Sequence, residues 1–133
     1  MNALARFALV AGAAALSGCV AFDQGPLALK GIWGGPHIGL DLEGGLGTVR
    51  FDCAAGSIDQ PIISGGPFSV PGSYRPGQTG QVRVGQVFVA KRATYSGTAT
   101  KTDMTLTVTL EDGEVLGPYV LKAGAPPELS PCP

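Results

Sequence analysis

The chain has 133 residues, with nine lysine and arginine residues against ten aspartate and glutamate residues and a formal net charge of −1. This length suits one domain and is too short for two. The near balance of charge, with no basic stripe, argues against a nucleic-acid partner.

The first eighteen residues have the pattern of a secretory signal. Arg6 is the only charged residue in this segment, and an apolar run follows it from Phe7 to Leu16. A helix needs about 20 apolar residues to cross a bilayer, so this run is too short to span one. Its length and the small residues at its end are typical of a signal peptide. The sequence therefore predicts export, with residues 1–18 removed.

The signal ends in Leu16-Ser17-Gly18-Cys19, which resembles the lipobox of bacterial lipoproteins. The resemblance implies diacylglycerol on the Cys19 sulfur, cleavage before Cys19 and acylation of the new amino terminus, for instance by palmitate. The partner implied is a bacterial membrane, held through the lipid anchor. Val20 in place of aspartate resembles enterobacterial sorting to the outer membrane, facing the periplasm. The alternative is an ordinary secretory signal with Cys19 kept as a structural thiol.

If Cys19 carries lipid, Cys53 and Cys132 remain as an even pair in an oxidising compartment. A disulfide between them closes a loop of about 80 residues and contributes about 4 kcal/mol through chain entropy. The alternatives are two buried thiols, or a metal site that no Cys-x-x-Cys or nearby Cys/His cluster supports. We predict the disulfide.

After a lipidated amino terminus and tether over residues 19–30, residues 31–133 are predicted to form one β domain. The dominant pattern is alternation with period two. Residues 27–33 alternate until Gly34-Gly35-Pro36, where we expect the strand to break. Residues 38–42 and 49–53 predict a hairpin around the glycine-rich turn at 44–47.

The middle of the chain is less regular. Residues 58–63 contain Pro61, which leaves an edge strand or a loop. A short strand begins at Phe68 and is cut by Pro71-Gly72, and residues 74–77 predict a turn. The valines from 82 to 89 change phase across Gly85, as in a β-bulge.

The last third predicts a meander of three strands, over residues 93–100, 104–110 and 115–122, with a hairpin turn at Asp112-Gly113. An extended tail follows from Ala125 to Pro133, which Cys132 would pin to the domain. Counted together, about eight strands predict an all-β protein. We expect a small antiparallel up-and-down β-barrel, with a sandwich as the alternative.

Gly31-Ile32-Trp33 resembles the Gly-x-Trp motif of lipocalins, whose tryptophan closes one end of an eight-stranded barrel. Other segments resemble a group of small bacterial β proteins, secreted or lipid-anchored, to which no activity is assigned. These segments are Trp33–Leu40, Phe51–Ile58, Tyr95–Gly97, Met104–Val108 and Leu116–Pro118. The resemblance implies a lipocalin-like fold and an envelope address, and it adds no chemistry.

His37 is the only histidine. It is expected on the polar face of its strand with Asp41, and Asp52 is expected opposite. Such a cluster can hold a metal or perform acid–base chemistry. The alternative, an ordinary solvated face, is favoured because ligand spacing and a second histidine are both missing. No Gly-x-Ser-x-Gly motif or phosphate loop is present, and no cofactor is predicted.

Two functions remain at this point. The first is a non-enzymatic envelope lipoprotein that binds an envelope protein or a small apolar ligand. A filled interior favours interaction and a cavity favours ligand binding; the side chains expected inside are Leu40, Phe51, Tyr95, Leu106, Val108 and Tyr119. The alternative is a small metal-dependent or hydrolytic enzyme centred on His37.

Overall fold

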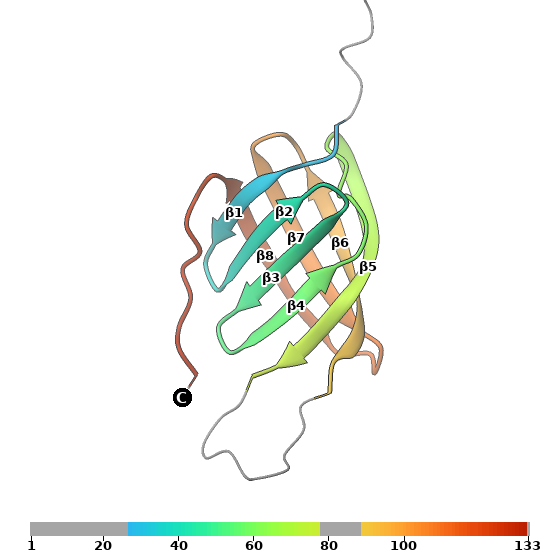
Figure 1. The fold of residues 1–133 in the computed structure, drawn as a ribbon, viewed down its shortest axis with the longest axis vertical. Coiled ribbons are helices and arrows are strands. Elements are labelled where there is room, and N and C mark those ends of the chain that lie inside the picture. Colours follow the sequence, from blue (N-terminus) through green and yellow to red (C-terminus); the bar gives the residue numbers. More distant parts are fainter. Residues whose placement is uncertain (1–26, 78–88, 133) are drawn as a thin grey trace, which may run out of the picture.

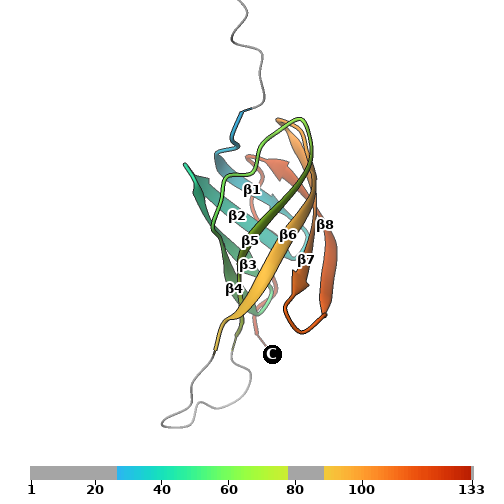
Figure 2. The same ribbon diagram turned by 90° about the vertical axis from the view of Figure 1, so that its right-hand side faces the viewer.

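A computed structural model describes residues 27–77 and 89–132, and these form a single β-barrel (Figures 1 and 2). Its strands are β1 (Gly31–Gly35), β2 (Ile38–Glu43), β3 (Leu46–Phe51), β4 (Ala54–Ile58), β5 (Gly66–Pro76), β6 (Lys91–Ala99), β7 (Asp103–Leu110) and β8 (Val115–Ala123). Each strand pairs antiparallel with the next, and β8 closes the barrel on β1. The predicted all-β, up-and-down barrel is confirmed. In the ranges that the structure describes, no helix is long and apolar enough to cross a membrane.

Three predictions concern residues outside the described ranges. They are the signal peptide over residues 1–18, the lipid site at Cys19 and the bulge at Gly85. The meander of the last third is confirmed, because β6, β7 and β8 follow the predicted segments within a few residues.

The core lies inside the barrel because alternate residues of each strand point inward. One row of paired residues runs from Trp33 to Leu40 and on to Val49. Across the barrel, Val70, Tyr95 and Val108 form another row. The largest fully buried side chains are Trp33, Tyr95, Ile38, Ile58, Ile62, Met104, Leu106, Leu121, Val49 and Val108. The interior positions are therefore occupied by large apolar side chains.

Tyr95 lies inside the barrel, and its position explains why β4 was not predicted from the sequence. Its hydroxyl donates a hydrogen bond to the Ser73 carbonyl over 2.6 Å. A Cβ at Gly72 would lie 2.8 Å from the tyrosine ring, and one at Gly56 would overlap the hydroxyl. β4 therefore carries Gly56 where a bulky strand residue would collide. We predicted a strand that continues to Cys53, whereas β3 ends at Phe51 and β4 begins at Ala54.

β5 runs without interruption from Gly66 to Pro76, so the predicted break at Pro71-Gly72 and the predicted turn at 74–77 are wrong. A proline has no amide hydrogen, so it is tolerated in a strand only where no neighbouring strand needs a hydrogen bond from that position. β4 ends at Ile58, opposite Gly72. Pro71 therefore lies just beyond the last residue pair between β4 and β5, where its missing amide hydrogen breaks no hydrogen bond of the sheet. Its carbonyl accepts a hydrogen bond from the Asp59 amide over 2.9 Å.

The segment that contains Pro61 is a loop rather than an edge strand, and it joins β4 to β5. Ile63 forms an isolated antiparallel bridge with Ala28, which lies before β1. At the other end of β1 the strand stops within the break predicted at Gly34-Gly35-Pro36, but only after both glycines. β1 includes both glycines, and the turn into β2 is Pro36-His37.

Candidate functional site

Residues 125–132, here called the C-terminal strap, lie along the outside of β1 and β2 (Figure 1). The Glu128 amide donates to the Gly35 carbonyl over 3.1 Å, and the His37 amide donates to the Glu128 carbonyl over 2.9 Å. A Cβ at Gly39 would lie 2.5 Å from the Pro127 side chain, and one at Gly34 would overlap the strap backbone. Gly34, which belongs to the predicted strand break, and Gly39 in β2 therefore let the strap lie close.

The strap ends at the predicted disulfide, which is confirmed. Cys53 and Cys132 are bonded across a sequence separation of 79, with their Cα atoms 4.8 Å apart. Cys53 lies in the turn between β3 and β4. The bond therefore joins the end of the strap to the same end of the barrel as the Pro36-His37 turn.

His37 and Asp52 form a pair beside this disulfide. The His37 Nδ1 lies 2.7 Å from Asp52 Oδ2, and Asp52 Oδ1 accepts the Ser130 amide over 2.9 Å. The hydrogen bond from the Ser130 amide lowers the pKa of Asp52, and the His37 side chain lowers it further. Because Ser130 belongs to the strap, one carboxylate connects the strap to the β1–β2 turn.

The backbone of His37 is unusual because its φ is +70°, in the left-handed region that few non-glycine residues adopt. Its place in a turn differs from the prediction, which put it on the polar face of a strand. The tight turn needs this conformation to bring β1 back into β2. In doing so it directs the imidazole toward Asp52 rather than along β2.

Asp41, the third residue of the predicted cluster, lies elsewhere. It belongs to β2 and pairs with Ile32 and Thr48 on the neighbouring strands. Nowhere in residues 27–77 and 89–132 do three histidine, cysteine, aspartate or glutamate side chains gather as metal ligands. The structure thus brings together His37 and Asp52 and leaves Asp41 apart.

The His37–Asp52 pair has the arrangement of a general base. If Nδ1 carries the proton donated to Asp52, Nε2 is left to accept one from a bound group. The imidazole is 63% exposed and the Asp52 side chain 36%. Within the described residues the ring forms no hydrogen bond besides that to Asp52. The arrangement therefore supplies a base and its orienting carboxylate, open to bulk water.

The six side chains expected inside the barrel are largely found there. Five of the six are buried, and Tyr119 is half-buried against the ring of Phe51; the five are Leu40, Phe51, Tyr95, Leu106 and Val108. Trp33 is fully buried, and its indole nitrogen donates to the Lys30 carbonyl over 3.3 Å.

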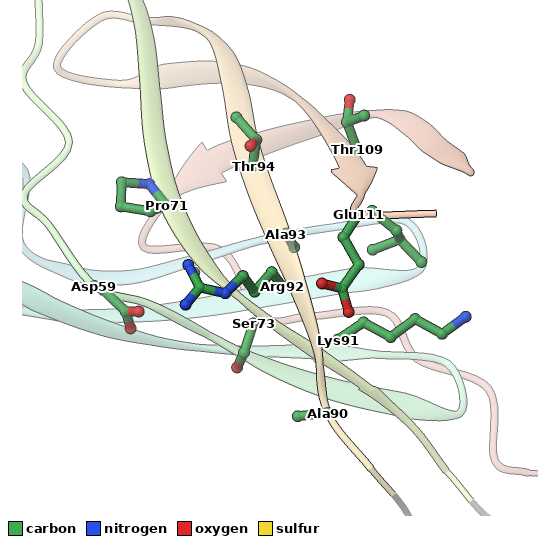
Figure 3. Close-up of a pocket in the computed structure, with 12 residues that line it drawn as sticks. Asp59, Pro71, Ser73, Ala90, Lys91, Arg92, Ala93, Thr94, Thr109 and Glu111 are labelled. Atoms are coloured by element: carbon green, nitrogen blue, oxygen red, sulfur yellow. The ribbon is translucent and has the colours of Figure 1, made fainter. Parts of the chain in front are cut away.

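A polar groove of about 570 Å³ crosses β5, β6 and β7 on the outside of the barrel (Figure 3). Figure 3 shows the Arg92 guanidinium on the side of Asp59, while Lys91 points the other way. Lys91 forms an ion pair with Asp112 over 2.8 Å. The groove combines both signs of charge and is open to solvent. Sequence reasoning missed it because its residues come from separate segments whose adjacency only the closed sheet produces.

No protein-family model, curated protein or solved structure matches the chain.

Proposed function

We propose that this chain is an exported, lipid-anchored envelope protein that works as a non-enzymatic interaction module through its outer surface. The supporting observation is the filled interior. A site for a small apolar ligand needs an enclosed space of about 300–1,000 Å³. In this barrel large side chains such as Trp33, Tyr95 and Leu106 take up the interior, each of them fully buried.

Two features support the envelope address. The segment Leu16–Cys19 has the residue types of a lipobox, preceded by a charged residue and an apolar run. The second feature is independent of the first. The Cys53–Cys132 disulfide belongs to proteins that mature in an oxidising compartment, as exported proteins do.

Native mass spectrometry of the protein purified from bacterial envelopes in mild detergent tests both parts of the proposal. We expect residues 1–18 to be absent, a lipid-sized mass increment on Cys19 and no further small molecule. Cys19→Ser should remove the increment and release the chain from the membrane fraction. An unmodified Cys19 refutes the anchor, and a stoichiometric co-purified apolar molecule refutes the interaction reading in favour of a carrier.

The second candidate function is a small hydrolase that uses His37, and the 2.7 Å contact with Asp52 is the observation in its favour. Hydrolysis of a panel of activated esters and phosphoesters tests it. A hydrolase requires a wild-type rate that His37→Ala abolishes and Asp52→Asn reduces. The interaction module predicts no difference among the three proteins, and Asp41→Asn serves as the control for a carboxylate outside the pair.

A further inference from the structure

One end of the barrel, here called the entry rim, is formed by residues 27–30, the β2–β3 turn with Leu46, the loop 59–65 and the turn 100–102. Figures 1 and 2 show the beginnings of β1 and β5 and the β6–β7 turn together at this end. The Leu29 amide donates to the Ile62 carbonyl over 2.8 Å, and the Ser64 amide donates to the Leu27 carbonyl over 2.9 Å. These bonds hold the chain before β1 against the loop before β5.

The entry rim exposes apolar side chains. Ile63 is 43% exposed, and Leu27 is also exposed, whereas the adjacent Leu29 and Ile62 are buried. Leu46, at the start of β3, is exposed near the same loop. It follows Gly45, where an added Cβ would lie 3.7 Å from Pro61. Apolar side chains thus project outward around the loop 59–65, although the backbone of this loop is hydrogen-bonded to residues 27–29.

Two cations accompany these apolar residues. Lys30 and Lys101 are exposed, and neither forms an ion pair with any described residue. Both border an open hollow of about 550 Å³ whose lining is mostly apolar and includes Leu27, Leu29 and Trp33. Apolar side chains with lysines beside them are the combination found at membrane interfaces, where the lysines meet lipid phosphates.

The opposite end of the barrel also exposes apolar residues, Val89 before β6 and Val115, but the setting of Val115 is different. Val115 is 59% exposed at the start of β8. It follows a turn that carries Glu111, Asp112 and Glu114. Anionic lipid headgroups repel such a group of carboxylates. The rim has the carboxylates of Glu43 and Asp59 beside Leu46, but its two lysines border the hollow lined by Leu27, Leu29 and Trp33.

We propose that the entry rim docks onto the phospholipid surface and orients the barrel with the His37–Asp52 pair and the Cys53–Cys132 disulfide away from the membrane. This inference rests on the proposed lipid anchor at Cys19. Residues 20–26 separate Cys19 from Leu27, so the eight intervening steps reach at most about 28 Å. The tether joins the barrel at the rim, and no other part of the described surface is held so near the lipid.

Quenching of tryptophan emission by brominated phospholipids tests the orientation. The lipidated full-length mature chain is reconstituted in vesicles of phosphatidylcholine and phosphatidylglycerol, with and without bromine on the acyl chains. Ile63→Trp reports the rim and Val115→Trp the opposite end, and both retain the buried Trp33 as a common background. We expect a loss of emission for Ile63→Trp in brominated vesicles and no more change for Val115→Trp than for the wild type.

Leu46→Trp is a second reporter at the rim, for use if Ile63→Trp does not fold. Near-ultraviolet circular dichroism checks that each variant is folded. Quenching at Val115→Trp overturns the orientation. Absence of quenching at both rim positions in chains that float with the vesicles overturns the docking and leaves the anchor intact. A chain that lacks lipid on Cys19 and fails to float overturns the anchor and this inference together.

Discussion

Tyr95 is the residue on which the interior packing depends most. Its hydroxyl is buried and its single partner among the described residues is the Ser73 carbonyl. Burial raises its pKa above the ordinary range, so the hydroxyl stays protonated and continues to donate at every physiological pH.

Tyr95→Phe removes this donor and leaves the ring in place. We expect the free energy of unfolding in urea, followed by Trp33 fluorescence, to fall by about 1 kcal/mol. Gly72→Ala tests the space beside the ring, because its Cβ would lie 2.8 Å from the ring and would overlap a backbone carbonyl. It should cost about 1–3 kcal/mol. Wild-type stability in both variants would contradict the described packing.

Asp52 predicts a pH dependence. Its pKa is lowered in the folded protein, chiefly by the Ser130 amide. A lowered folded-state pKa means that the carboxylate contributes stability above its unfolded pKa, and that this contribution disappears as the pH falls through the folded-state pKa. Asp52→Asn should therefore lose stability at neutral pH and show a smaller further loss on acidification below about pH 4 than the wild type.

Urea denaturation midpoints measured from pH 7 to pH 2.5 provide the check. Asp41→Asn is the matched control, since the Asp41 side chain forms no hydrogen bond or ion pair with the described residues. Parallel pH profiles for Asp52→Asn and the wild type would show that the Ser130 and His37 contacts do not hold the strap in solution.

At the scale of elements, the strap is the least local feature of the fold. Without the disulfide, its attachment consists of the backbone bonds through Glu128, the Ser130 contact with Asp52 and packing on the β1–β2 glycines. The Cys53→Ser/Cys132→Ser double variant should lose about 4 kcal/mol of unfolding free energy, as expected for a closed loop of this length.

Amide hydrogen exchange should show which part of the structure loses protection when the disulfide is removed. In the double variant we expect faster exchange at Glu128, Ser130 and His37, and little change at Leu106 in the centre of β7. The wild type under reducing conditions should behave like the double variant, which controls for the serine substitutions. Equal protection of the strap with and without the disulfide would mean that its backbone contacts suffice.

The elements that the sequence predicts well are those whose partners are their chain neighbours. The alternation in β7 and the Asp112-Gly113 turn signal the final meander, and cysteine parity signals the disulfide. β4 is not recognised because Gly56 interrupts its apolar pattern, and the need for glycine there comes from Tyr95, which is distant in sequence. The glycines of β1 mislead for the same reason, since Gly34 makes room for residues 125 and 126 and Gly35 for the Val120 backbone of β8. Of the site, His37 and Asp52 follow from strand pairing, whereas the contact with Ser130 depends on the path of the tail.

At the scale of the whole molecule, a barrel this small is a packed core enclosed by a sheet. Leu106 is fully buried at its centre, on the strand between β6 and β8. Leu106→Ala removes three methylene-sized groups from that core, which should cost about 2–5 kcal/mol and leave a dry cavity. The wild type should show no saturable binding of benzene or xenon, because large buried side chains occupy the interior positions. The variant should bind either of them and recover part of its lost stability, as linkage requires for a ligand that binds only the folded state.

Thermal unfolding with and without benzene, together with xenon-induced NMR shifts of interior methyl groups, measures both effects. Val120→Ala is the control, because Val120 lies exposed on β8 and its truncation opens no interior space. Saturable benzene binding by the wild type would place a pre-existing cavity inside the barrel. The carrier function would then replace the interaction module as the better account of the molecule. Binding confined to Leu106→Ala keeps the function on the outer surface, where the entry rim, the strap and the polar groove of β5–β7 are the surfaces available to a partner.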